Sequence, residues 1–228
     1  MDVMQFTQAL SRIWVLETRL LDKTKVERML EANSADEVLK ILGETEYANI
    51  MGNIKRAADY EEILSTELKR VYKLVYELCP VKEIVDLMST KYKYHNIKVL
   101  LKGKFLEKDL SNMLIDLGRE DLNELKRKID TDNFRDLKGN VEKAVLEVIS
   151  DFEANKDPQK IDIIVDRYMF KELDEIKKSL NYKFTDKLVN AMIDSTNVRT
   201  LLRVKKQGKG REFASEVLVT GGAISKDT

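Results

Sequence analysis

The side chains that most often carry out catalysis are scarce in this chain. It has one histidine, His95, and one cysteine, Cys79. A histidine acts as a general base only when neighbouring groups tune its pKa, and the sequence has no HExxH, CxxC or Walker A pattern to supply such neighbours. Cys79 precedes Pro80, which is typical of a small buried residue at a helix end. We therefore expect no catalytic residue, no cofactor and no metal site, and hence no enzyme.

One basic cluster, KKQGKGR at 205–211, could attract phosphate groups. Because no strand pattern precedes its glycines, the cluster is more typical of a solvated connection between two helices. The chain has 40 basic and 40 acidic residues, whereas a general nucleic-acid binder carries a basic excess. We expect no nucleic-acid partner, but a helical-repeat adaptor that binds RNA or protein stays open as the alternative function.

The elements that position these residues are predicted to be helices. The chain has only 2 prolines and 9 glycines in 228 residues, so few positions resist helix formation. Ile97, Leu100, Leu101 and Phe105 follow helical spacing, as do Val198, Leu201 and Leu202, and each set is expected to be the buried face of a helix. Ser34 and Glu37 have the spacing of a capping box. The fold class is therefore all-α.

A phrase of nine residues occurs twice in the chain. It reads YHNIKVLLK at 94–102 and STNVRTLLR at 195–203. When the N-terminal sequence is aligned with the first copy at an offset of 84 positions, Ile13 falls on Ile97. The copies predict tandem helical units of about a hundred residues, with boundaries at 1–59, 60–158 and 159–228. We expect Asn96 and Asn197 to be equivalent residues near helix starts.

Two local structures are compatible with the second copy of the phrase. Asp194 could cap a helix by accepting from the backbone N–H of Asn197, or both residues could lie on the polar face of one continuous helix. The final unit is expected to be incomplete, so that the segment after Arg203 is extended, mobile or covered by a neighbouring molecule.

The chain shows no targeting signal in its first residues. The start, MDVMQFTQALSRIW, has no basic region of the signal-peptide kind, and no apolar run approaches the ~18 residues of a membrane span. A single cysteine fits a reducing compartment. The expected location is therefore cytoplasmic.

With these features in place, the sequence resembles the C subunit of the A/V-type ATPases, a family that includes the d subunit of the vacuolar enzyme. The resemblance rests on five motifs that occur in the family's order from about Gln8 onward, one of them present twice. They are ALSRIWVLETRLL, ILGETEYAN at 41–49, the phrase at 94–102 and again at 195–203, VDRYMFKEL at 165–173 and VTGGAI at 219–224. The family's Asp-x-x-Asn signature falls on Asp194 and Asn197, and its Gly-Gly turn on Gly221 and Gly222. In the other copy Asn96 is retained, but Lys93 replaces the acid.

This resemblance implies a mechanical role. Three helical units would surround a pseudo-threefold axis as a funnel, here with the third unit incomplete. The protein would be a non-catalytic part of the central stalk and would link the central shaft to the membrane rotor ring. Its partners would be shaft and ring subunits on the cytoplasmic face, and it would contact the membrane only through the ring.

Overall fold

The fold is made of helices in every part of the chain that the structure describes. This computed structural model describes residues 3–51, 56–117 and 119–224, and within these ranges it contains no strand. The all-α prediction is therefore confirmed. Contacts between residues divide the chain into two compact units, residues 2–85 (the N-terminal unit) and residues 86–228 (the C-terminal unit).

The N-terminal unit contains short helices followed by one long helix. Its elements are η1 (Val3–Phe6), α1 (Thr7–Glu17), α2 (Lys23–Leu30), α3 (Ala35–Leu42), α4 (Ala48–Met51), η2 (Ala57–Asp59) and α5 (Tyr60–Leu78). Helix α3 begins as the sequence predicts, because Ser34 Oγ accepts from the backbone N–H of Glu37 at 3.2 Å. The Glu37 carboxylate in turn accepts from the backbone N–H of Asn33 at 2.9 Å, so the predicted cap is confirmed.

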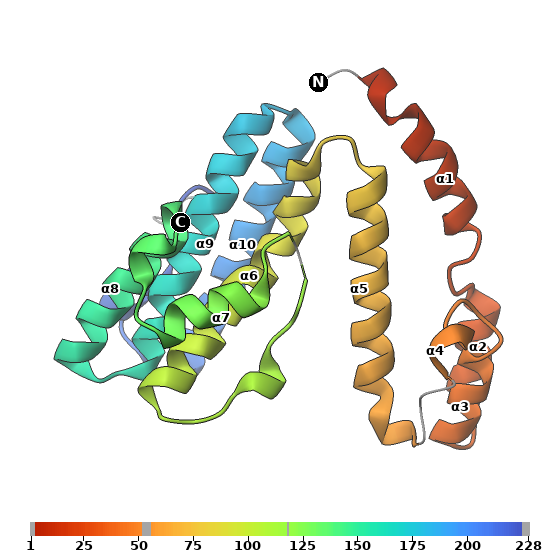
Figure 1. The fold of residues 1–228 in the computed structure, drawn as a ribbon, viewed down its shortest axis with the longest axis horizontal. Coiled ribbons are helices and arrows are strands. Elements are labelled where there is room, and N and C mark those ends of the chain that lie inside the picture. Colours follow the sequence, from red (N-terminus) through yellow and green to blue (C-terminus); the bar gives the residue numbers. More distant parts are fainter. Residues whose placement is uncertain (1–2, 52–55, 118, 225–228) are drawn as a thin grey trace. The chain divides into compact units, whose positions relative to one another are not determined.

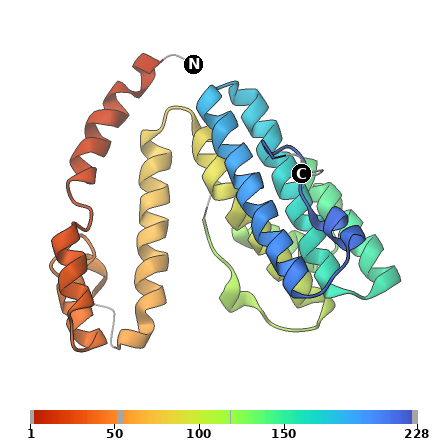
Figure 2. The ribbon, with the colours of Figure 1, turned by 180° about the vertical axis from the view of Figure 1, so that it is seen from behind.

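The C-terminal unit is dominated by four long helices. Its elements are α6 (Lys82–Phe105, which starts in the N-terminal unit), η3 (Ser111–Met113), α7 (Leu122–Asp130), η4 (Phe134–Asp136), α8 (Gly139–Asn155), α9 (Pro158–Leu180), α10 (Lys183–Lys206) and α11 (Arg211–Val217). Helix α9 packs against α8 and against α10 (Figures 1 and 2). This three-helix layer and α6 carry most of the buried side chains described below.

The ends of α9 follow from local residue chemistry. Asp157 precedes the helix and accepts from the backbone N–H of Gln159 at 2.9 Å, while Pro158 takes the first helical position, where its missing N–H costs nothing. Asn181 ends the helix in the left-handed conformation with φ of 46°, a conformation that Asn tolerates better than most residues. The chain then turns directly into α10.

Two buried clusters hold the C-terminal unit together, and α6 contributes to both. The larger contains Tyr94, Ile97, Leu100 and Leu101 of α6 with residues of α7, α8 and α9 and with Leu137, which follows η4. The residues of the three helices are Leu125, Ile129, Val141, Val145, Val148, Phe152, Ile161, Ile164 and Val165. The smaller joins Leu87 of α6 to Phe170 and Leu173 of α9 and to Val189 and Ile193 of α10. Because close-packed interiors resist deformation, these clusters make the unit stiff.

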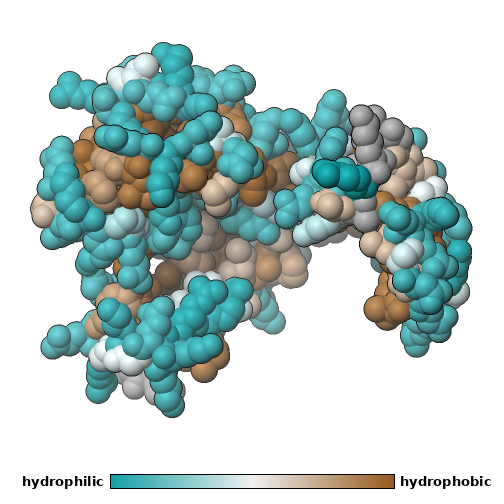
Figure 3. Space-filling model, turned by 90° about the horizontal axis from the view of Figure 1, so that it is seen from below, coloured by the Kyte–Doolittle hydropathy of each residue, from teal (hydrophilic) through white to brown (hydrophobic). Residues whose placement is uncertain are grey.

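The surface is mostly hydrophilic but carries scattered hydrophobic areas, as one face of the molecule shows (Figure 3). Within the described ranges, no helix has both the length and the apolar character that crossing a membrane requires.

Candidate functional site

Asn96 fixes a loop segment to the middle of α6. Its side-chain amide donates to the carbonyl oxygen of Ile115 at 2.7 Å, and its side-chain oxygen accepts from the backbone N–H of the same residue at 2.8 Å. Asn96 is 4% exposed. One buried amide therefore satisfies both backbone groups of a residue outside regular secondary structure, which would otherwise be costly to bury.

Asn197 makes the same pair of bonds in α10. Its side chain donates to the carbonyl oxygen of Val219 at 2.9 Å and accepts from the backbone N–H of Val219 at 2.9 Å. Helices α6 and α10 both have 24 residues, and each asparagine is the fifteenth residue of its helix. The two asparagines are thus alike in position and in contacts.

The expectation that these asparagines lie near helix starts is wrong. Both lie well inside continuous helices, so of the two structures considered for Asp194 and Asn197, the continuous helix is the one observed. The physical reason is that each side chain is used for a bond across the fold, to a segment 19 or 22 residues away, and not for local capping of its own helix.

Asp194 binds the backbone beyond the Gly-Gly turn. Its two carboxylate oxygens accept from the backbone N–H groups of Ala223 and Ile224, each at 3.1 Å. Gly221 has a φ of 101°, which favours glycine, and a Cβ atom at Gly222 would overlap the Asp194 carboxylate. Asp194, Asn197 and the two glycines therefore form one arrangement that holds residues 219–224 against α10.

We expect Gly222→Ala to loosen the segment at residues 219–224. Because the new methyl group must displace the Asp194 carboxylate, the amide protons of Val219 and Ala223 should exchange with solvent roughly 5- to 30-fold faster, which corresponds to about 1–2 kcal/mol. Amide hydrogen exchange of the full chain measures this effect. In an Asp194→Ala background the same glycine substitution should accelerate exchange far less. An unchanged acceleration there would contradict the proposed clash.

Lysines of α6 pair with carboxylates of α9 along an antiparallel ladder. Lys98 Nζ lies 2.7 Å from Asp166 Oδ1, and Lys102 Nζ lies 2.7 Å from Asp162 Oδ2. Residue numbers increase along α6 and decrease along α9 from one pair to the next. The pairs therefore fix the antiparallel direction of the two helices and their register.

A third rung of this ladder is largely buried. Lys93 and the hydroxyl of Tyr94 both bind the Glu172 carboxylate, with Tyr94 donating at 2.6 Å, and Lys93 also reaches Glu120 at 3.2 Å. Burial and the Glu172 carboxylate together raise the pKa of the Tyr94 phenol. Burial alone would lower the pKa of the Lys93 ammonium, but Glu120 and Glu172 outweigh it and raise this pKa. Lys93 occupies the position in α6 that Asp194 occupies in α10. The residue at this position is therefore a lysine paired with carboxylates in one helix and an acid in the other.

The single histidine lies beside Asn96 and binds the same loop segment, whereas the single cysteine lies at the end of α5. His95 Nε2 donates to the carbonyl oxygen of Met113 at 2.9 Å, and among the described residues no hydrogen bond or ion pair joins it to a carboxylate. Cys79 is the C-terminal cap of α5, as the sequence indicates, with Sγ 3.1 Å from the carbonyl oxygen of Val81. It is half-buried and not fully buried.

The basic cluster is only in part the expected connection between two helices, because Lys205 and Lys206 end α10 (Lys183–Lys206) and Arg211 begins α11 (Arg211–Val217). Residues 207–210 join α10 to α11, with Gly208 in the left-handed conformation at φ of 67°. The Lys209 ammonium lies 5.3 Å from the centroid of the Phe213 ring. Where the structure describes the chain, no group of three or more His, Cys, Asp and Glu side chains is arranged to hold a metal ion.

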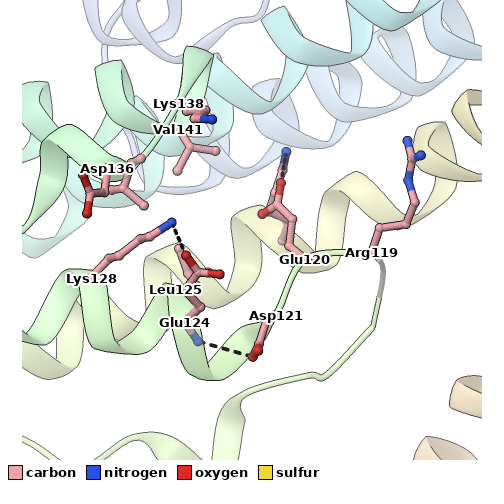
Figure 4. A pocket seen from close by; sticks show the side chains of 11 residues that line it. Arg119, Glu120, Asp121, Glu124, Leu125, Lys128, Asp136, Lys138 and Val141 are labelled. Carbon is pink, nitrogen blue, oxygen red and sulfur yellow. Dashed lines mark hydrogen bonds and ion pairs between the residues drawn. The ribbon is translucent and has the colours of Figure 1, made fainter.

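A pocket of about 440 Å³ lies between α6, α7 and the start of α8 (Figure 4). Charged side chains of both signs line it, and several pair with one another. Lys128 lies 2.7 Å from Glu124, and Lys93 lies 3.2 Å from Glu120. Arg119 pairs with Asp86, which lies outside the lining. Figure 4 shows the Lys128–Glu124 pair and the bond from the Glu124 backbone to Asp121. Because these charges are paired within the protein, the pocket does not present a surface of one charge to a ligand.

The sequence interpretation missed the segments that the asparagines hold and the ladder between α6 and α9. The sequence does not reveal that Ile115 and Val219 are bound, because the asparagines contact only their backbone groups, which every residue type has. The ladder did leave a signal, because Lys98 and Lys102 are four residues apart, as are Asp162 and Asp166. Such spacing places each pair on one side of its helix.

Comparisons with known proteins point to one family. A family model described as the ATP synthase (C/AC39) subunit matches residues 9–228. The C subunit of the V-type sodium ATPase of Enterococcus hirae is 30% identical over 213 residues, covering 93% of this chain and 64% of that protein. The C subunits of the A-type ATP synthases of Methanocaldococcus jannaschii and Pyrococcus abyssi are 22% and 24% identical, each over 96% of this chain. The chain spans about three fifths of the length of these relatives.

Proposed function

Because this chain belongs to the ATP synthase (C/AC39) subunit family, we propose that it is a non-catalytic subunit of the central stalk. In this role it joins the central shaft to the membrane rotor ring and transmits rotation during ATP-driven ion transport or ATP synthesis. The match of the family model to residues 9–228 is the observation that carries the proposal. The protein would be peripheral to the membrane, on its cytoplasmic face, and would reach the membrane through the ring.

The internal contacts support a mechanical role. An element that transmits torque must resist twisting, and here α6 is tied to α9 by ion pairs as well as by a shared buried cluster. The two asparagines fix irregular segments to long helices by the same pair of bonds. These matched bonds support a repeat that relates α6 to α10. The tandem units that we propose, with boundaries at 1–59, 60–158 and 159–228 around a pseudo-threefold axis, follow from the family resemblance.

The alternative, an adaptor for RNA or protein, gains no support from a specific feature. The basic residues at 205–211 lie at the end of α10, at the start of α11 and in the short connection between them, and the charges of the whole chain balance. An RNA adaptor requires a broad basic face. The balanced composition of this chain does not indicate one.

Removal of the chain from its complex tests the proposed coupling role. Washed membranes that lack the chain should hydrolyse ATP without moving ions, because shaft rotation would no longer reach the ring. Re-addition of the purified chain should restore ion transport, and it should co-sediment with both shaft and ring subunits. The purified chain alone should hydrolyse no ATP. Ion transport at full rate without the chain, or ATP hydrolysis by the chain that a single substitution abolishes, would contradict the proposal.

A further inference from the structure

The two exposed rungs of the ladder between α6 and α9 repeat along both helices. Lys98 and Lys102 are four residues apart, as are Asp162 and Asp166, and four residues make about one helical turn. A shift of α9 by one turn along α6 would therefore still bring one aspartate beside one lysine. The observed register gains one further ion pair, but the Asp166 and Asp162 side chains are 39% and 42% exposed. Because water screens such pairs, this gain is small.

The apolar contact between the same two helices has the same spacing. Ile97 and Leu101 of α6 share a buried cluster with Ile161 and Val165 of α9, and the members of each pair are also four residues apart. Apolar contacts are not directional, so one of these side chains can replace another after a shift by one turn. These residues hold the helices together but distinguish poorly between registers.

The buried rung, formed by Lys93, Tyr94 and Glu172 and called the Glu172 cluster, has no such repeat. Tyr94 is fully buried and donates to Glu172 at 2.6 Å, and Lys93 pairs with the same carboxylate. The residues of α9 one turn before and after Glu172 are Tyr168 and Ile176, and neither carries a negative charge. After a shift by one turn, both donors of α6 would therefore lose the carboxylate. Buried polar groups without a partner are costly.

We propose that the Glu172 cluster sets the register of α9 on α6 and excludes the registers that are shifted by one turn. In helical assemblies a single buried polar group can select a register that apolar contacts leave open. Leu87 also contacts α9 outside the four-residue repeat, through the cluster that it forms with Phe170 and Leu173. Because this contact is apolar, we assign it the smaller part in the choice of register. The proposal concerns the folded chain alone and does not depend on the coupling role.

The distance between two spin labels tests this proposal. Lys91→Cys on α6 and Gln159→Cys on α9 place the labels at exposed positions, in a full chain that carries Cys79→Ser so that no other thiol reacts. Double electron–electron resonance then reports one distance for each register. Because a helix rises by about 1.5 Å per residue, a shift by one turn changes this distance by roughly 5 Å. We expect a single distance in the chain that keeps Glu172.

Variants of this labelled chain identify the group that sets the register. Glu172→Ala should add a second distance in roughly a tenth of the molecules or more. Glu172→Gln keeps an acceptor for the Tyr94 hydroxyl but removes the negative charge, so it should add the same distance in a smaller share. As a matched control, Asp162→Ala with Asp166→Ala removes two carboxylates from the same helix and should leave a single distance. Leu87→Ala should also leave a single distance.

Two results would overturn the proposal. The first is a single, unchanged distance in the Glu172 variants that keep their helices, which circular dichroism checks. Where Glu172→Ala does not fold, the milder Glu172→Gln gives the answer. The second is a new distance in Leu87→Ala, or in the double aspartate variant, that is as abundant as in the Glu172 variants. The apolar contact or the exposed ion pairs would then set the register.

Discussion

Glu172→Ala is expected to destabilise the chain by about 2–4 kcal/mol. The substitution removes the carboxylate that binds both Lys93 and the hydroxyl of the fully buried Tyr94. It leaves the ammonium with Glu120 alone and the phenol without its acceptor. Urea denaturation of the full chain, followed by circular dichroism, measures the loss.

The chain offers a closely matched control for this prediction. Glu147 also binds a cation and the following tyrosine, Arg167 and Tyr168, but the Arg167 and Glu147 side chains are 55% and 41% exposed. Because water screens an exposed pair, Glu147→Ala should cost less than about 1 kcal/mol. Equal losses for the two glutamates would show that burial does not set the strength of the Glu172 cluster.

The same cluster makes stability depend on alkaline pH. The pKa values of Tyr94 and Lys93 are both raised in the folded chain, so the folded state holds these protons more tightly than the unfolded state. The resulting stability is fully present below the unfolded pKa values, about 10 for both residues, and is lost as the pH rises above them. Tyr94→Phe should make this loss shallower. An identical pH dependence in the variant would show that the phenol contributes nothing to it.

Local patterns in the sequence predicted the helices and one of their caps. The spacing of Ile97, Leu100 and Leu101 predicts a buried helical face, and the structure confirms it. The Ser34 cap depends on residues three positions apart, a distance over which sequence and geometry are tightly linked. These predictions succeeded because each depends only on neighbours along the chain.

Contacts between distant segments could not be predicted in this way. The spacing of Val198, Leu201 and Leu202 is that of a buried face, yet these residues are exposed, because burial depends on which element packs against the helix. Asn197 looked like a capping residue because Asn favours helix starts, but its partner is Val219. The repeated phrase carried the most information, since it marked the two asparagines as equivalent before their partners were known.

Asn96→Ala is expected to cost about 2–4 kcal/mol of stability, because the substitution leaves two backbone groups of Ile115 without partners in a poorly hydrated position. Asn197→Ala should cost less, about 1–2 kcal/mol, since Asn197 is only half-buried. Asn140→Ala is the matched control for Asn96. Asn140 is also buried, at 6% exposed, but it makes one bond to a side chain, that of Glu175. Urea denaturation of the three variants measures these losses.

Two further variants separate the two bonds and the two asparagines. Asn96→Asp keeps an acceptor for the Ile115 N–H but faces its carbonyl oxygen with a second oxygen, so it should be no more stable than Asn96→Ala. The losses for Asn96→Ala and Asn197→Ala should add in the double variant within about 0.5 kcal/mol, since they bind different segments. If Asn96→Ala cost no more than Asn140→Ala, the paired backbone bonds would not be what holds residue 115 to α6, and the equivalence of the two asparagines would lose its energetic basis.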